Sequence, residues 1–271
     1  MALQSSGQIT LNQIHIEAGG TSGTQASLND TDIRSLAGIS SGQIAFNNFY
    51  GASSGAEFVA AVTRREDNEA GIDSSSQAIN LTGAGVQTGD LVVIAITADT
   101  SDHTNMNLIG MSEVKLHDSG NNLPVSLVFY GYWAAGNSNP YLDGTGGNSS
   151  TRLRAMSLVA GIFRNTNTSL LNSNNTGGSS GMPDPPSLTS VAGTKIIICT
   201  GHLDDDEVLT VSAPSGFTKA GSIATDPFTR GGVTGSTTMM AYKITTTSVN
   251  ENPGAFGGNG NDYNDSVTMR F

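Results

Sequence analysis

From residue 57 onward the chain is a series of short apolar segments separated by turn-forming residues, and this pattern constrains the fold more than any other feature. The segments are rich in β-branched and aromatic residues and cover residues 57–62, 91–97, 125–133, 156–163, 195–200, 237–244 and 267–271. Clusters of Gly, Asn, Asp and Ser separate them, without helix-like periodicity between them. Many short strands joined in this way are typical of two packed sheets. We therefore predict a mainly β protein, an antiparallel, jelly-roll-like β-sandwich.

The first fifty residues follow a helix-like spacing instead. Their apolar positions include Leu11, Ile14, Ile16, Leu28, Ile33 and Leu36. Ser27 and Asp30 have the spacing of a helix cap, and Gly38 is suited to end the helix that follows. The change of period predicts two domains: a module of short helices at residues 1–52 and a β-sandwich domain at residues 53–271.

The helical module has too few apolar residues to be expected to form a core alone. Its burial would then be completed on the β domain or on another subunit. Phe46, Phe49 and Tyr50 lie at i, i+3 and i+4, which predicts one aromatic face. The residues that we predict for docking or for a subunit interface are Phe46, Phe49, Tyr50, Leu28, Ile33 and Leu36. Large aromatic anchors of this kind dominate the energetics of many interfaces.

The β domain contains segments that resemble one another. The similar pairs are 89–94 with 193–198, 126–130 with 238–242, and 157–160 with 266–269. Two similar halves, at about 55–165 and 183–271, would explain them, joined through the Asn/Ser/Gly-rich residues 165–181. Chance likeness between short β patterns is the alternative.

Charge and composition exclude several classes of partner and of stabilisation. The net charge of −11 and the absence of any Lys/Arg cluster oppose binding to nucleic acid. The opening residues lack signal-peptide features and no apolar run is long enough for a membrane span, so we expect synthesis in the cytoplasm. The one cysteine, Cys199, lies in an apolar run and is expected to be a small buried side chain.

Motifs of catalysis are weak in this sequence. Residues 51–55 match the G-x-S-x-G pattern of hydrolases, but a helix-like segment precedes them and a strand-like one follows, the reverse of that motif's setting; we interpret them as a linker. The histidines are scattered, at His15, His103, His117 and His202, and are expected at the surface or in caps. Trp133 is expected to pack in the core. We predict a protein that is not an enzyme and has no catalytic residue.

Acidic residues follow two of the similar apolar segments. They are Asp99, Asp102, Asp204, Asp205, Asp206 and Glu207. Carboxylate oxygens suit Ca²⁺, and the two sets would converge if both loops lay at one end of a sandwich. The spacing of an EF-hand is absent, and charges at loop tips are usually solvated. We expect no cofactor, with a calcium site at these six residues as the alternative.

Several phrases of the sequence are similar to a known kind of protein. Residues 8–20, 27–34 and 44–53 resemble a short helical N-terminal module of tail and fibre-type proteins of marine and cyanobacterial phages. Residues 183–186, 214–217 and 252–256 are similar to phrases of a β domain appended to that module. The resemblance implies a non-enzymatic structural protein of a tailed-bacteriophage virion and carries no catalytic motif.

The resemblance leaves the position on the particle open, and the partners follow from the short helices, which would be stabilised at a subunit interface. We expect a short tail fibre, adaptor or baseplate component on the tail or another surface of the particle. Its N-terminal module would bind other tail proteins, it would self-associate as a trimer, and its outward loops would contact the host surface. A capsid decoration protein is one alternative. A glycan-binding module, calcium-assisted in one version, is the other, and a depolymerase ranks below both.

Overall fold

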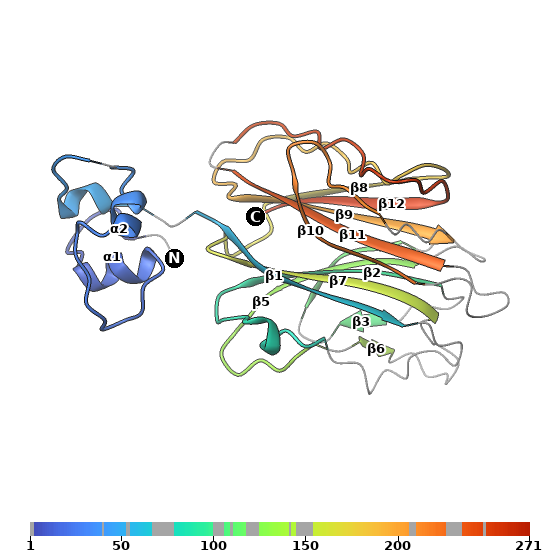
Figure 1. Cartoon of the computed structure of the whole chain (residues 1–271), viewed down its shortest axis with the longest axis horizontal. Coiled ribbons are helices and arrows are strands. Elements are labelled where there is room, and N and C mark those ends of the chain that lie inside the picture. Colours follow the sequence, from blue (N-terminus) through green and yellow to red (C-terminus); the bar gives the residue numbers. More distant parts are fainter. Residues whose placement is uncertain are drawn as a thin grey trace. The chain divides into compact units, whose positions relative to one another are not determined.

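In the computed structural model the chain divides into two compact units, Met1–Ala56 and Glu57–Phe271 (Figure 1). The structure describes residues 3–39, 41–52, 55–66, 79–99, 106–108, 111–117, 125–140, 142–144, 154–205, 210–225, 235–245 and 248–271.

The first unit is built from three short helical elements. They are α1 (Leu11–Glu17), α2 (Thr31–Leu36) and the 3₁₀ helix η1 (Phe46–Phe49). Thr10 and Gln13 form a reciprocal capping box at the start of α1, with the Gln13 amide donating to Thr10 Oγ1 at 3.2 Å. Ser27 and Asp30 form a turn before α2, in which the Ser27 amide donates to Asp30 Oδ2 at 2.8 Å. The helix therefore begins later than the predicted cap.

The first unit has an apolar cluster of its own. Its buried members are Ile9, Ile14, Ile33 and Phe49, and the partly buried residues packed on them are Leu3, Leu11, Ala18, Ala26, Leu28, Leu36, Ala37, Ile44 and Ala52. Helices this short are marginal in water, so packing onto a shared cluster is what stabilises them.

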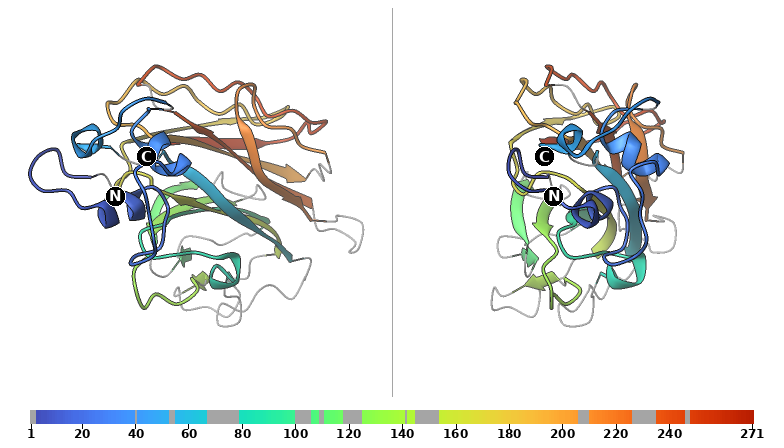
Figure 2. Two further views of the ribbon diagram at one scale, coloured as in Figure 1. Left: turned by 60° about the vertical axis from the view of Figure 1, so that its left-hand side comes forward. Right: turned by 90° about the vertical axis from the view of Figure 1, so that its left-hand side faces the viewer.

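The second unit is two five-stranded antiparallel sheets packed face to face (Figures 1 and 2). The first sheet has the order β1-β7-β2-β5-β4, from Glu57–Glu66, Arg154–Arg164, Leu91–Asp99, Val125–Tyr132 and Ser112–His117. The second has the order β10-β11-β9-β12-β8, from Thr218–Ala224, Gly235–Ile244, Ile196–Asp205, Asn264–Arg270 and Asn172–Gly178. A small pair, β3 (Met106–Leu108) with β6 (Leu142–Gly144), and the 3₁₀ helix η3 (Thr82–Ala84) complete it. The predicted mainly β sandwich is confirmed.

Each sheet comes from one contiguous half of the unit, and both sheets have the same topology. The corresponding strands are β1 with β8, β2 with β9, β4 with β10, β5 with β11, and β7 with β12. When the strands of each half are numbered in chain order, both sheets read 1-5-2-4-3. This differs from a jelly roll, in which consecutive strands alternate between the two sheets. Residues 165–181, predicted as a joining stretch, contain strand β8.

The first row of each central strand aligns the two halves. Leu91 begins β2 and pairs with Tyr132, which ends β5, and Ile196 begins β9 and pairs with Ile244, which ends β11. The next row is Gly131, Val92 and Ile162 in the first sheet and Lys243, Ile197 and Arg270 in the second. Val92 therefore corresponds to Ile197. The sequence match of 89–94 with 193–198 instead pairs Val92 with Ile196. That alignment is shifted by one residue, so it would match a side chain on the outer face of one sheet with a side chain on the inner face of the other.

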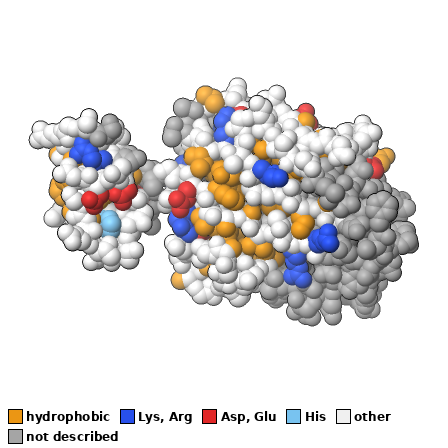
Figure 3. Space-filling model, in the orientation of Figure 1, with side chains coloured by type: hydrophobic (Ala, Val, Ile, Leu, Met, Phe, Trp, Pro, Cys, Tyr) orange, Lys and Arg blue, Asp and Glu red, His pale blue; other side chains and the backbone are white. Residues whose placement is uncertain are grey.

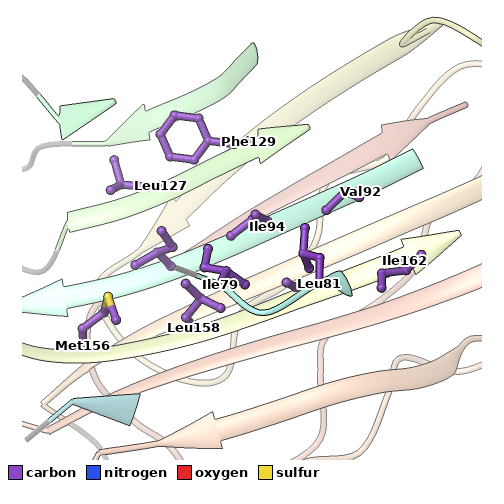
Figure 4. Packing of buried hydrophobic residues seen from close by; sticks show 11 residues of the cluster. Ile79, Leu81, Val92, Ile94, Leu127, Phe129, Met156, Leu158 and Ile162 are labelled. Carbon is purple, nitrogen blue, oxygen red and sulfur yellow. The ribbon is translucent and has the colours of Figure 1, made fainter. Parts of the chain in front are cut away.

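Both faces of each sheet are covered, which explains why the central strands are apolar at almost every position. The outer face of the first sheet carries a cluster of Ile79, Leu81, Val92, Ile94, Ile96, Leu127, Phe129, Met156, Leu158, Ala160 and Ile162 (Figure 4). The outer face of the second sheet carries Cys199, Leu203, Val211, Met239, Ala241 and Phe256. Loops from the same half cover each cluster.

Aromatic residues join the inner faces of the two sheets at one end. Phe58 stacks on Tyr242 with ring centroids 4.8 Å apart, and Phe163 meets Tyr242 at 5.7 Å. Tyr130 of the first sheet lies 5.5 Å from Phe271, which follows the second.

On the face shown in Figure 3, hydrophobic side chains of the sandwich are interspersed with few charged ones.

Hydroxyl groups join the inner faces further along the same strands. The Thr238 hydroxyl lies 2.6 Å from that of Thr97 and 2.8 Å from that of Ser157, and it donates to the Ser157 carbonyl at 2.9 Å. His202 Nδ1 lies 2.9 Å from Thr97 Oγ1. All four side chains are buried, so their polar atoms depend on hydrogen bonds inside the protein. We call this set the inter-sheet hydroxyl seam.

Replacing Thr238 by Val should destabilise the sandwich. Val has nearly the same shape but removes the hydroxyl, so the partners on Thr97 and Ser157 lose a bond inside the protein. We expect a loss of about 1–3 kcal/mol in the free energy of unfolding, measured by urea denaturation. Thr218→Val, at an exposed strand position, is the control and should change stability by less than about 0.5 kcal/mol. Equal effects of the two variants would contradict the role of the seam.

Candidate functional site

A cavity of about 150 Å³ opens on the outer face of the first sheet. Its lining residues are Val92, Met111, Gly131, Tyr132, Trp133, Asn137, Ser138 and Pro140. The lining combines aromatic and aliphatic side chains with a few polar groups, which is the usual character of a small-molecule site. We call it the Gly131 cavity.

At the cavity a glycine takes a place where the strand pattern calls for a side chain. On β5, Leu127 and Phe129 belong to the outer cluster, and the next outward position is Gly131, paired with Val92. Glycine within a strand often marks a place where a ligand or another backbone approaches closely. Trp133 then forms the far wall.

The corresponding place in the second half is filled. Lys243, the counterpart of Gly131, pairs with Glu251 at 2.8 Å, and its ammonium stands 5.7 Å above the ring of Phe217. The counterpart of Ile162 is the fully buried Arg270, which donates to the carbonyl of Val249 at 2.7 Å. Burial lowers the pKa of Arg270, and the nearby carboxylate of Glu251 opposes this effect. The second half therefore fills with side chains the space that the first half leaves open beside Gly131, although both halves have the same topology.

Backbone bonds hold Trp133 in place. Its amide donates to the Asp90 carbonyl at 2.8 Å, and its carbonyl accepts from Gly89 at 2.7 Å. Asp90 is buried and receives two bonds from Arg164, each 2.9 Å long. Hydrogen bonding to Asp90 raises the pKa of Arg164 further, so the guanidinium stays charged. Trp133 packs against the outer cluster as predicted and also lines the cavity.

The loop after Trp133 is anchored at its far end. Asn139 Oδ1 accepts from the amides of Leu81 and Thr82 at 3.0 and 3.1 Å, and the Pro140 carbonyl accepts from Ile79 at 2.8 Å. These bonds tie the loop to the segment that covers the outer cluster. These hydrogen bonds thus fix the rim of the cavity in the absence of a ligand.

Two polar side chains stand at the rim. Asn137 and Ser138 are exposed, on a turn in which Gly136 has a φ of +84° and the Asn137 amide donates to the Ala134 carbonyl at 3.1 Å. Within the described part of the chain, neither side chain has a hydrogen-bond partner. Their donors and acceptors are free to bind a molecule in the cavity.

Tyr132 carries an unusual hydroxyl. The oxygen is buried and has no hydrogen-bond partner among the described residues, and its ring meets that of Tyr130 edge-on at 6.3 Å. Burial raises the pKa of Tyr132 well above its usual range, and Tyr130 adds to the effect. The side chain is therefore neutral at all ordinary pH values.

The predicted docking residues divide into two groups. Phe49 and Ile33 are fully buried in the first unit's own cluster, and Leu28 and Leu36 pack partly buried against it. Phe46 and Tyr50 are 42% and 43% exposed. The three aromatic residues thus do not share one face, because η1 is a single turn whose Phe49 points into the cluster. The Tyr50 hydroxyl donates to the Gly7 carbonyl at 2.5 Å.

The acidic candidates are placed only in part. Asp99 lies at the end of β2, and Asp204 and Asp205 lie within β9 rather than in a loop tip. Asp102, Asp206 and Glu207 fall outside the described residues. The residues that the structure describes contain no group of three or more His, Cys, Asp or Glu side chains able to hold a metal ion. A calcium site at the six acidic residues stays a prediction.

The histidine interpretation was wrong at two positions, His202 and His15. His202 is buried between the sheets in the hydroxyl seam rather than at the surface, because Thr97 of the opposite sheet and Thr200 of its own strand supply partners for its ring. His15 is also buried, with Nε2 at 2.8 Å from Thr24 Oγ1. His103 falls outside the described residues, and His117 ends β4. Cys199 is buried as predicted, and burial raises the pKa of its thiol, which disfavours the reactive thiolate.

No protein-family model matches the chain, and neither the curated proteins nor the solved structures include a significant match. None of the helices in the described ranges is long and apolar enough to cross a membrane.

Replacing Phe49 by Ala should unfold the first unit. The side chain is fully buried in a cluster with only three other buried members, so we expect a loss of about 3–5 kcal/mol. The dispersion of amide NMR signals from residues 3–52 would measure it. Phe46→Ala is the control and should preserve that dispersion. If both variants left the unit folded, the cluster would not depend on Phe49.

Replacing Tyr132 by Phe should preserve or raise the stability of the sandwich. The change removes a buried hydroxyl that makes no bond within the described residues and keeps the ring. We expect a gain of up to about 1 kcal/mol in thermal or urea unfolding. Tyr263→Phe, at an exposed position, is the control. A marked loss of stability in Tyr132→Phe would show that the hydroxyl has a partner, such as bound water.

Proposed function

We propose that the chain is a non-enzymatic structural protein of a tailed-bacteriophage virion. In this proposal the first unit docks onto another virion protein and the sandwich carries a surface that contacts the host. The resemblance of residues 8–52 to phage tail and fibre modules supports the first part. The division of the chain into two compact units supports the separation of docking from presentation.

One observation carries the docking role. The large hydrophobic residues exposed in the described part of the chain are Ile16, Phe46, Tyr50, Ile244, Val249 and Tyr263. Half of them lie in the first unit, although that unit is much the smaller one. A small unit that exposes Phe and Tyr side chains while keeping a cluster of its own is suited to bind a preformed partner through them.

A structural role also fits the chemistry of the sandwich. Its hydroxyl seam, which contains both Ser and His, is buried between the sheets, and the Ser157 hydroxyl bonds to Thr238 rather than to His202. Two carboxylates, Asp90 and Glu251, are engaged with Arg164 and Lys243. These groups support the fold rather than an open catalytic site.

Within the virion we favour a tail fibre, adaptor or baseplate component that assembles as a trimer. A threefold assembly would bring three copies of the exposed aromatic residues to one axis. A capsid decoration protein is the alternative. The number of copies per particle separates the two, since decoration proteins follow the capsid lattice and tail components follow the symmetry of the tail.

Replacing Phe46 by Ser should reduce incorporation into particles of the phage that encodes the chain. Removing an anchor of this size from an interface weakens binding by about tenfold or more. Quantitative mass spectrometry of purified virions would measure the ratio to the major capsid protein. Tyr263→Ser is the matched control, since this aromatic residue of the sandwich is 45% exposed, close to the 42% of Phe46.

Both variants should remain folded, which circular dichroism would verify. Normal incorporation of the Phe46 variant would show that attachment does not run through this residue. Absence of the unaltered chain from purified virions would overturn the virion role itself.

A further inference from the structure

We infer that the Gly131 cavity binds one neutral sugar ring of a glycan. This inference goes beyond docking through the first unit and rests on the sandwich alone. It starts from the comparison of the two halves. Lys243, Glu251 and Phe217 fill the second half where the first half leaves space above Gly131. The hollow is thus not a consequence of the shared topology.

The lining of the cavity defines the chemistry of its ligand. Val92, Met111 and Trp133 offer an apolar and aromatic wall, and Asn137 and Ser138 offer donors and acceptors at the mouth. None of the described residues that line the cavity is charged. A matching ligand has one apolar face, polar groups on its edge and no net charge. A pyranose ring has C–H bonds on its faces and hydroxyls around its edge, so it meets all three conditions.

The size of the cavity agrees with a single ring. A cavity of 150 Å³ in another protein holds benzene, so the similar volume here admits one six-membered ring. The hydroxyls of a sugar would extend beyond this space toward Asn137 and Ser138, which are exposed at the mouth. The remainder of a glycan chain would then leave on the solvent side.

The site is also held in position before binding. Trp133 is fixed by two backbone bonds and the loop end is fixed by Asn139, so little ordering is required when a ligand enters. One ring with a few hydrogen bonds still binds weakly, with Kd on the order of 1 mM. Several copies on one particle would raise the effective affinity for a glycan-covered surface.

Trp133 makes the test direct, because it is the single tryptophan of the chain. Its indole N–H signal and its fluorescence both report on this cavity alone. The full chain would be titrated up to about 50 mM with methyl glycosides of glucose, galactose, mannose and N-acetylglucosamine, well above the Kd expected for one ring. We expect at least one glycoside to shift the indole signal in a saturable way.

Two variants and one non-sugar ligand make the test specific. Gly131→Val fills the cavity and should weaken binding at least tenfold, and Asn137→Ala should weaken it several-fold without affecting folding. Asn259→Ala, at an exposed loop position, is the matched control and should bind normally. Cyclohexanol, a ring without the hydroxyl edge, should bind more weakly than the best glycoside.

Three outcomes would overturn the inference: no glycoside shifts the indole signal, Gly131→Val binds as well as the unaltered chain, or cyclohexanol binds as tightly as the best glycoside. None of these outcomes depends on whether the chain is incorporated into virions.

Discussion

Face-to-face packing of two equal sheets is the constraint on which the rest of the sandwich depends. Each central strand is buried on its inner face by the other sheet and on its outer face by loops of its own half. A strand in that position cannot carry charge on either side without a partner. Buried hydroxyls are therefore gathered into the inter-sheet seam, where Thr238 satisfies Thr97 and Ser157 together. Removing one hydroxyl of the seam therefore deprives several buried groups of a hydrogen-bond partner at once.

The two outer faces have the same arrangement of strands but carry different side chains. In the second half, the counterparts of Gly131 and Ile162 are Lys243 and Arg270, and loops with Glu251 close over them. Two of the nitrogens of Arg270 have no partner within the described residues, so this covered face retains a desolvation cost. The first half avoids that cost by using small and apolar residues. Its outer face consequently has room for another molecule beside Gly131.

The sequence predicted those features that depend on local periodicity. Continuous apolar runs located β2 and β9, and the change of period separated the first unit from the sandwich. Strand β8 was missed because its residues, 172–178, include no apolar side chain; the strand is held by its backbone pairing with β12. The burial of His202 could not be predicted either, since its partners come from distant parts of the chain. The single-residue shift between the similar segments became visible only from strand pairing.

The glycine at the cavity was visible in the sequence, but its role can be interpreted only from the fold. A glycine between Tyr130 and Tyr132 in an otherwise apolar strand indicates a bulge, an approach of backbone, or a ligand. Pairing excludes a bulge, because Gly131 remains in register with Val92. Within the described residues, the space beside Gly131 is lined by Trp133 and Met111, which favours a ligand over an approach of backbone. The ligand interpretation is what remains, and it accounts both for the glycine and for the tryptophan beside it.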